Sequence, residues 1–189
     1  DSKIIQKCLF ILLPKKSNKK IKKSYDTIKF LLSRYFAGLI VQIFILFIIY
    51  TIILLIIGTP NAVVIAFLCS LLNLIPFIGP FIGGILMVLL TMSSHISEDF
   101  SAVILPKAIY VTIGFAFGQI IDNFLSQPLI FSNSVKSHPL EIFLVIVIAG
   151  LLFGPIGMIA AIPTYTALKV VGKEFLSENR IIKELTKNL

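Results

Sequence analysis

The chain has 189 residues, is 57% hydrophobic and has a mean hydropathy of +1.00, and only six charged residues lie between Tyr35 and Leu168. Six charges cannot cover the surface of a soluble domain of that length, so the composition excludes an ordinary soluble protein and favours one embedded in a lipid bilayer. The net charge of +8 comes from Lys and Arg near both ends, which is the positive-inside pattern of membrane proteins. These basic runs lack the interleaved aromatic residues that would stack on nucleic-acid bases, which argues against nucleic-acid binding.

Residues 1–35 are predicted to form a basic, amphipathic region on the cytoplasmic side. From Ile21 to Tyr35 apolar side chains recur every three or four residues, and lysines occupy the opposite face. This pattern predicts a helix that lies on the membrane surface, where its lysines meet anionic lipid headgroups. Because the spacing also fits heptads, a short coiled coil or a subunit contact is the alternative.

Residues 36–171 are predicted to form the membrane domain. Its first segment, Phe36–Ile57, carries no charge and is long enough to span a hydrocarbon core of about 30 Å at about 1.5 Å per residue. After a turn at Gly58–Asn61, the segment Ala62–Met92 is apolar throughout but is interrupted by proline and glycine. Its two pieces are too short to cross separately, so it either folds back as a re-entrant hairpin or forms one broken crossing.

The second half of the membrane domain repeats this organisation. After a polar loop, Ala102–Ile121 is predicted to cross the bilayer, with Lys107 near its start reaching back to the interface. Asp122–Pro139 is predicted to be a loop that contains both polar and apolar residues. Ile142–Val171 is a second long apolar segment, and Gly154–Gly157 breaks it in the middle.

These elements predict an all-α, multi-pass membrane protein with Gly/Pro-broken or re-entrant helices. Residues 172–189 would form a charged cytoplasmic tail, and the basic flanks place both ends of the chain in the cytoplasm, which requires an even number of crossings. Two hairpins give two crossings, and two broken full crossings give four. The acidic loop at Glu98 and Asp99 favours an external position and therefore hairpins. Because the chain begins with Asp1 and shows no signal peptide, we expect it to be the C-terminal portion of a longer protein.

The two broken segments are the candidates for a transport path. In the first, Pro76 and Pro80 remove backbone donors and free carbonyl groups, which are tolerated at membrane depth only where protein or a wet cavity receives them. Asn73 adds a side-chain amide just before this break. The second segment is broken at Gly154–Gly157 and bent again at Pro163. Paired segments interrupted by Gly and Pro indicate the binding site of a transporter, and the alternative is that both are packing kinks.

Asp122 is the ionisable residue that most invites a functional interpretation. It directly follows an apolar run, and a carboxylate at membrane depth is a candidate to carry a proton or a cation. The alternative is a carboxylate at a helix end in the interface, solvated or hydrogen-bonded by Asn123 or Gln127.

Other local patterns favour structural roles. His138 and Glu141 flank Pro139, and proline in the first helical position followed by an acidic residue in the first turn is typical of a helix start. Three Gly-x-x-x-Gly spacings occur, and they are expected to let helices approach one another closely.

The sequence contains no pattern that indicates an enzyme. It has no HExxH, no Walker A loop and no Ser/His/Asp arrangement, and its two cysteines form no CxxC or Cys/His cluster. We therefore expect no catalytic residue, no cofactor and no metal site. Without an ATP-binding motif, any transport would be passive or driven by a gradient.

At this point the motifs resemble those of the autoinducer-2 exporter family, which includes the PerM-type permeases. Three stretches carry the resemblance in the family's order and spacing: Asn73–Pro80 matches N-x-I-P-x-x-G-P, Asp122–Pro128 with Ser137–Leu140 matches the loop before the last membrane segment, and Leu152–Gly157 with Ala161–Pro163 matches the closing motif. The stretch Phe131–Leu140 is most similar to the PerM-type branch. The matched motifs span most of Arg34–Lys173.

The resemblance implies a multi-pass permease of the bacterial inner membrane, about twice as long as this chain. The remaining part would hold several more membrane helices and a soluble insert, and the protein would form homo-oligomers. One departure is Glu141, which stands where the family often has an aliphatic residue.

The sequence therefore predicts a secondary transporter or passive exporter of a small solute or ion in the lipid bilayer, with a non-transporting membrane scaffold as the alternative. A transporter should place Asn73, Gln119, Asp122 and Asn123 around a common wet cavity, whereas a scaffold should satisfy them separately by neighbouring helices. The candidate site residues are Asn73, Pro76, Gly79, Pro80, Asp122, Asn123, Pro128, His138, Pro139, Gly154, Pro155, Gly157 and Pro163.

Overall fold

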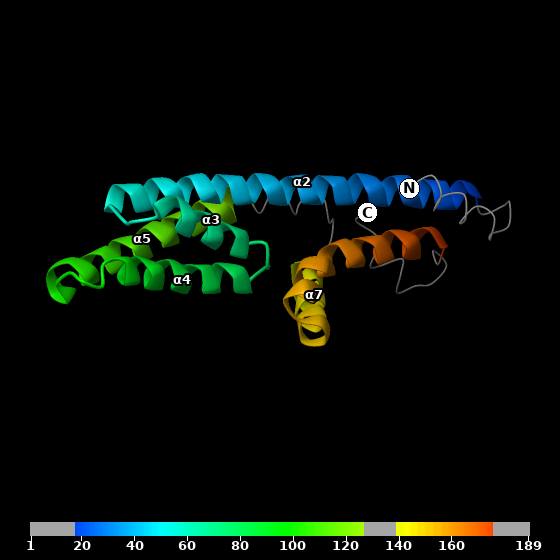
Figure 1. The fold of residues 1–189 in the computed structure, drawn as a ribbon. Helices are drawn as coiled ribbons and strands as arrows, with labels where there is room; N and C mark the ends of the chain where they lie inside the picture. Colours follow the sequence, from blue (N-terminus) through cyan, green and yellow to red (C-terminus); the bar gives the residue numbers. More distant parts are fainter. Residues whose placement is uncertain (1–17, 127–138, 176–189) are drawn as a thin grey trace.

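The computed structural model describes residues 18–126 and 139–175, and this part of the chain is helical and contains no strands (Figure 1). The elements in chain order are α2 (Asn18–Ile57), α3 (Ala62–Leu72), α4 (Ile78–Ser94), the π-helical turn η2 (Phe100–Ile104), α5 (Leu105–Ile121), the π-helical turn η3 (Asp122–Ser126) and α7 (Pro139–Phe175). Within the described residues, three helical stretches are long and apolar enough to cross a membrane, namely Lys20–Ile57, Phe100–Phe124 and Leu140–Phe175. The predicted class, an all-α multi-pass membrane protein, is confirmed.

Helix α2 runs without a break for 40 residues, about 60 Å at the usual helical rise. The basic region at Ile21–Tyr35 is the beginning of this same helix and runs directly into the charge-free segment, and its position on the membrane surface stays a prediction. No proline interrupts the chain where Tyr35 meets Phe36, and Gly38 is accommodated within the helix, so the helix continues in one direction. Tyr35, at the end of this basic region, packs in a core with residues of α7, and Lys23 Nζ lies 3.2 Å from Glu174 Oε2.

The first broken segment folds back on itself as a helical hairpin of α3 and α4. Gly79 and Gly83 of α4 lie against the backbone of α3 at Leu72 and Cys69, so the two helices are antiparallel and in close contact. A side chain at Gly79 would collide with the Leu72 carbonyl group, and this is why the position requires glycine. The structure thus has a hairpin here in place of a straight crossing.

The second broken segment is also a hairpin. Within α7, Gly154 has φ 65° and ψ −153°, a conformation that is essentially restricted to glycine, and Pro155 begins the returning arm. Tyr165 Oη donates to Glu141 Oε2 over 2.9 Å, although a straight helix would hold these residues about 36 Å apart. Pro163 removes a backbone donor from the returning arm, and the ribbon changes direction in this region (Figure 1).

The two hairpins pack on different halves of α2. A buried core joins α3, α4 and α5 to the second half of α2; its members are Leu46, Tyr50, Leu54, Ala62, Ile65, Ala66, Cys69, Met87 and Val111. A separate core joins α7 to the first half of α2; its members are Tyr35, Leu39, Ile146, Ala161 and Ile162. Helix α2 is therefore the element that holds the two hairpins together.

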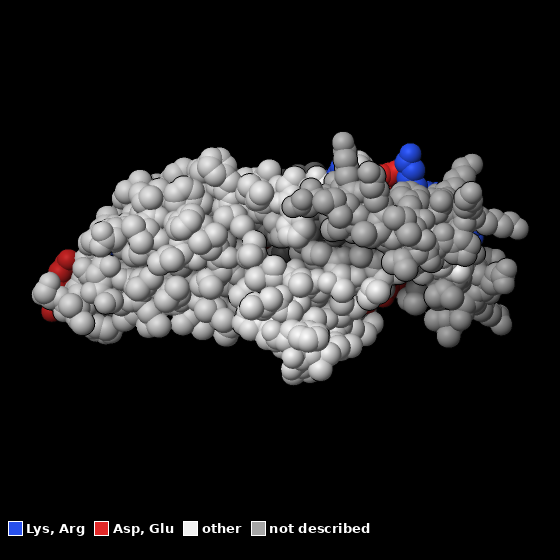
Figure 2. Space-filling view, turned by 45° about the vertical axis from the view of Figure 1, so that its right-hand side comes forward, with Lys and Arg blue, Asp and Glu red and all other residues white. Residues whose placement is uncertain are grey.

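The exterior is apolar over most of its length. In Figure 2 the described part of the visible face is almost free of coloured atoms, with acidic atoms at one end and both signs of charge at the other. At the tip of the α7 hairpin, Leu151, Phe153 and Ile156 are 83%, 72% and 78% exposed. Apolar side chains at such exposure suit contact with lipid.

Candidate functional site

Five polar side chains gather inside the helical bundle where α2, α5 and the tip of the first hairpin meet. Gln42 and Tyr50 come from one face of α2, two turns apart, and Gln119 and Asp122 come from consecutive turns at the end of α5. Asn73 is the C-cap residue of α3. We call these five residues the polar cluster, and they form two sets of hydrogen bonds between residues far apart in the sequence.

Asp122 is the charged member of the polar cluster and is 1% exposed. Gln42 Nε2 donates to its Oδ2 over 2.8 Å. Gln42 lies six residues beyond Phe36, where the charge-free part of α2 starts, which is about 9 Å along the helix axis. The carboxylate is thus buried against a neighbouring helix, in contrast to a solvated group at a helix end, and a buried charge needs such a partner to offset its desolvation.

The backbone changes its helical form at Asp122. The residue begins η3, a π-helical turn that continues directly from α5. Such turns widen a helix locally and are frequent at functional sites. The sequence placed Asp122 at the end of an apolar run, but it contains no signal for this change of helical form.

The other three members of the polar cluster form a second set of contacts. Gln119 Nε2 donates to Tyr50 Oη over 2.7 Å and to Asn73 Oδ1 over 3.1 Å. Asn73 Nδ2 donates to the Cys69 carbonyl oxygen over 3.0 Å, which supplies an acceptor beside the break of the hairpin. The Tyr50 ring stacks on Phe115 at 5.4 Å between centroids, so the hydroxyl is held in place by its ring.

Of the four residues that a transporter was expected to place around one cavity, three lie together and one does not. Asn73, Gln119 and Asp122 lie together in the polar cluster, where they are hydrogen-bonded by neighbouring helices. Asn123 is exposed on the outside of η3. Gln42 is the only strongly polar residue of the predicted crossing Phe36–Ile57, which is a signal in the sequence. Tyr50 carries no such signal, because a tyrosine in an apolar crossing is not distinguishable from a core aromatic.

The tip of the first hairpin holds the motif prolines in an unusual backbone. Residues 73–77 form the turn, and Pro76 accepts a bond from the Ile78 amide over 2.8 Å. Pro80 occupies the first turn of α4, where a missing N–H is tolerated. Phe77 has φ 65° and ψ −48°, a conformation that costs a bulky residue about 1–3 kcal/mol.

The motif of the second hairpin lies apart from the polar cluster. Gly154 and Pro155 form its turn, and Gly157 is buried against Ala149 of the opposite arm. The tip of the first hairpin instead meets α7 near its beginning, at Phe143. The two Gly/Pro breaks are not brought together. Pro139 begins α7 as expected, whereas Pro128 and His138 lie outside the described residues.

An ion pair inside the second hairpin was not predicted. The Lys169 side chain is 3% exposed, and its Nζ lies 3.3 Å from Glu141 Oε2, which also accepts from Tyr165. The sequence counted Lys169 with the basic flank because its partner lies 28 residues away along the chain. Glu141 thus joins the two arms of the hairpin in addition to standing in the first turn of α7.

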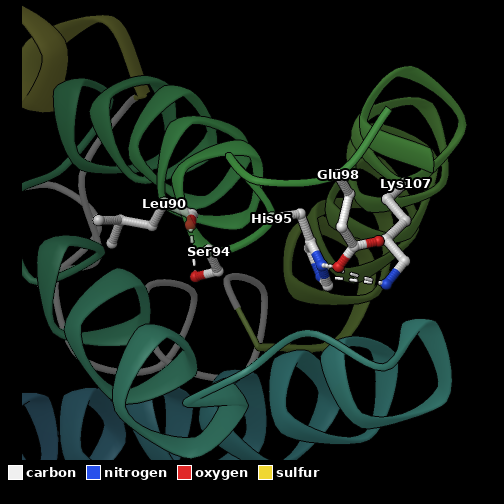
Figure 3. Close-up of polar contacts among 5 residues, drawn as sticks. All are labelled: Leu90, Ser94, His95, Glu98 and Lys107. Carbon is white, nitrogen blue, oxygen red and sulfur yellow. Dashed lines mark hydrogen bonds and ion pairs between the residues drawn. The ribbon is translucent and has the colours of Figure 1, made fainter. Parts of the chain in front are cut away.

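A second polar group closes the loop between α4 and α5 (Figure 3). His95 Nδ1 lies 2.6 Å from Glu98 Oε1, and Lys107 Nζ lies 3.1 Å from His95 Nε2. These partners suit an imidazole that donates at Nδ1 and accepts at Nε2. The hydrogen bond to His95 lowers the pKa of Glu98. Lys107 bends back to His95 in the loop before the crossing and fixes this loop, and its place at the lipid interface stays a prediction.

Comparison with known proteins identifies relatives over most of the chain. The model of the AI-2E family transporters matches residues 2–177. "Putative transport protein YrrI" of Bacillus subtilis (strain 168) is 29% identical over 177 residues, which cover 93% of this chain and 47% of that protein. "Putative transport protein YueF" of the same organism is 32% identical over 129 residues, covering 68% of this chain and 32% of that protein. No solved structure gives a significant match.

The chain thus spans about half of the length of YrrI and about a third of that of YueF. The family model covers all of the residues that the structure describes. Because the family model covers almost all of the sequence, the chain belongs to the AI-2E transporter family.

Proposed function

We propose that this protein is part of a permease that moves a small solute or ion across the bacterial inner membrane, either passively or coupled to a gradient. Both ends of the chain would lie in the cytoplasm, and the whole permease would be a homo-oligomer. The observation that carries the proposal is the buried Asp122, held by Gln42 at 2.8 Å inside a helix that is long and apolar enough to cross a membrane.

Asp122 would be the coupling group. As a carboxylate it accepts the Gln42 amide and holds η3 against α2. A proton or a cation on Asp122 would neutralise its charge, weaken the bond to Gln42 and loosen this contact. Loading and unloading of Asp122 would therefore change how the end of α5 packs on α2, and this link between binding and movement is what a secondary transporter requires.

The experiment uses the full-length protein in everted membrane vesicles with a preset pH gradient. The rate at which added Na⁺ or K⁺ collapses the gradient is measured with a pH-sensitive dye. We expect Asp122→Asn to lower this rate at least about tenfold while the amount of protein in the membrane stays unchanged. Asp26→Asn makes the same chemical change at an exposed position and should leave the rate unaltered.

Two outcomes would count against this reading. If Asp122→Asn retains the wild-type rate, Asp122 is not the coupling group. If the wild-type protein itself gives no cation-dependent collapse, exchange of these ions for protons is excluded, and the passage of an uncharged solute becomes the form of the proposal to pursue.

A membrane scaffold is the second candidate, and one observation favours it. Tyr50, Asn73 and Gln119 satisfy one another through hydrogen bonds between helices, as they would in a purely structural core. A scaffold, however, gains nothing from keeping Asp122 ionisable at 1% exposure, because an apolar residue would pack there without the desolvation cost. A scaffold should therefore tolerate Asp122→Leu combined with Gln42→Leu, whereas a permease should lose transport.

A further inference from the structure

The two hairpins touch one another at a small contact beside the middle of α2. Helices α3 and α4 pack in one core and α7 in the other, and within the described residues these helices make little direct contact across the divide. The turn of the first hairpin bridges it. Leu74 packs on the core around Tyr35 and Ile146, and the Phe77 ring lies edge-on to Phe143 with centroids 5.4 Å apart.

The same turn also reaches the polar cluster. Asn73, at the start of the turn, accepts from Gln119, and Phe77, four residues later, contacts α7. Five residues that are fixed at both ends cannot move at one end without disturbing the other. A movement of α7 that pulls Phe143 away would therefore displace Asn73, and a rearrangement of the polar cluster would displace Phe77.

The backbone of Phe77 makes this contact suited to having two states. Its φ of 65° with ψ of −48° is a conformation that L-residues rarely adopt, and it persists only where surrounding contacts hold it. Phe77 is 59% exposed, and its ring contacts that of Phe143. Backbone hydrogen bonds from Ile78 to Pro76 and from Gly79 to Ile75 also hold this turn, so separation of the rings would remove one of the restraints on the strained conformation.

We propose that Phe77 and Phe143 form a gate between the two hairpins, closed in this conformation, which must open for a solute to pass the polar cluster. The inference rests on the proposed transport function. It assigns the closure of the transport path to the contact between these two side chains. Phe77 and Phe143 act here by blocking and releasing the path, and the polar cluster would contact the solute.

The first test links the two positions chemically in the full-length protein. Phe77→Cys and Phe143→Cys are combined after Cys8 and Cys69 are replaced by serine, and a short bifunctional methanethiosulfonate joins the two thiols. We expect mass spectrometry to find the linked peptides and expect cation-driven collapse of the pH gradient to fall at least about tenfold. Reduction with dithiothreitol should restore it. The reagent should not change the rate of either single-cysteine protein relative to the same protein before treatment, whatever that untreated rate is.

Two results would overturn the gate. Linked protein that transports at the unlinked rate would show that the contact need not open. Failure to detect any linked peptide would show that the hairpins do not meet at these positions in the membrane.

A second measurement does not depend on transport. Nitroxide labels on the same two cysteines, in protein reconstituted into liposomes, report their separation by spectral broadening. The gate predicts a broadened and an unbroadened population whose proportions change when a pH gradient is imposed. One population that does not respond would overturn the gate even if the protein transports. A response in a protein that moves neither Na⁺ nor K⁺ would support the gate and contradict only the proposed exchange of these ions.

Discussion

Asp122 and Lys169 are two ionisable side chains that are almost inaccessible, and each solves the problem of a buried charge differently. Asp122 accepts a hydrogen bond from the neutral amide of Gln42 over 2.8 Å. Lys169 pairs with the carboxylate of Glu141, a direct compensation of charge. The first arrangement suits a group that exchanges a proton or ion, and the second suits one that holds two helices together.

The ion pair of the second hairpin should contribute more stability than the pair at the surface. Glu141→Gln weakens a partnership in which Lys169 is 3% exposed, and we expect it to lower the free energy of unfolding by about 1–3 kcal/mol. Glu174→Gln is the matched control, because its partner Lys23 is 71% exposed, and it should cost at most about 1 kcal/mol. Thermal unfolding of both variants in detergent checks this. Equal losses would mean that burial of the pair does not matter.

Glu98 should make stability depend on pH on the acid side. Its pKa is lowered in the folded protein, so its carboxylate contributes stability that is complete above the unfolded pKa of about 4.3 and is lost as the pH falls through the folded value. Glu98→Gln removes this contribution. The melting temperatures of wild type and variant should therefore differ near pH 6 and converge as the pH falls below about 4. A difference that is constant with pH would contradict the assignment.

At the scale of the elements, the positions of the Gly/Pro breaks could be predicted from the sequence. That the chain folds back into a hairpin at each break could not. The charge-free segment Phe36–Ile57 and the interruptions at Pro76 and Gly154 are local signals, and each is found where it was predicted. Whether an interrupted helix folds back depends on contacts such as Tyr165 with Glu141, 24 residues apart, which no local pattern encodes.

The same limit applies to the candidate site. Asp122 was recognised because a carboxylate beside an apolar run is visible in the sequence, but its partner Gln42 lies 80 residues upstream. Lys107 was identified as a residue near the start of a crossing, and only the fold shows that it turns to His95.

Gly154 should be the least replaceable residue of the second hairpin. At φ 65° and ψ −153° a Cβ atom is disfavoured whatever space surrounds it, so Gly154→Ala should lower stability by about 1–3 kcal/mol. Gly58→Ala is the comparison: that glycine also has positive φ, at 75°, but it lies in an open turn and should cost about 1 kcal/mol. Guanidinium or thermal unfolding gives both values, and a smaller loss at Gly154 would argue against the turn described here.

For the molecule as a whole, the arrangement of the hairpins on α2 decides which parts face which side. Helix α2 leads from the basic end of the molecule to the base of the first hairpin, and α5 returns from there (Figure 1). In each hairpin the two arms are antiparallel, so the chain returns to the end of the hairpin at which its first arm began. If α2 crosses the membrane, the loop after α4 and the start of α2 must lie on opposite sides.

Cysteine labelling in intact cells tests this placement. In a protein without Cys8 and Cys69, Ser97→Cys should react with a membrane-impermeant maleimide from outside, because it lies in the exposed loop after α4. Lys22→Cys, exposed near the start of α2, should react only after the membrane is permeabilised. If Ser97→Cys is protected and Lys22→Cys is reactive, the orientation is reversed. If both are labelled from the same side, the hairpin model is wrong.

The separation of Gln42 from Asp122 along the chain also has a consequence for biosynthesis. At roughly 5–20 residues per second, the ribosome adds the carboxylate roughly 4–16 s after its amide partner, since 80 residues lie between them. During that interval the nascent chain holds Gln42, and later Asn73, in the translocation machinery or the lipid without their final partners. Asp122 is the last residue of the polar cluster to be synthesised, and its donor Gln42 is already present when it is inserted. The order of translation therefore lowers the free-energy cost of inserting the charge.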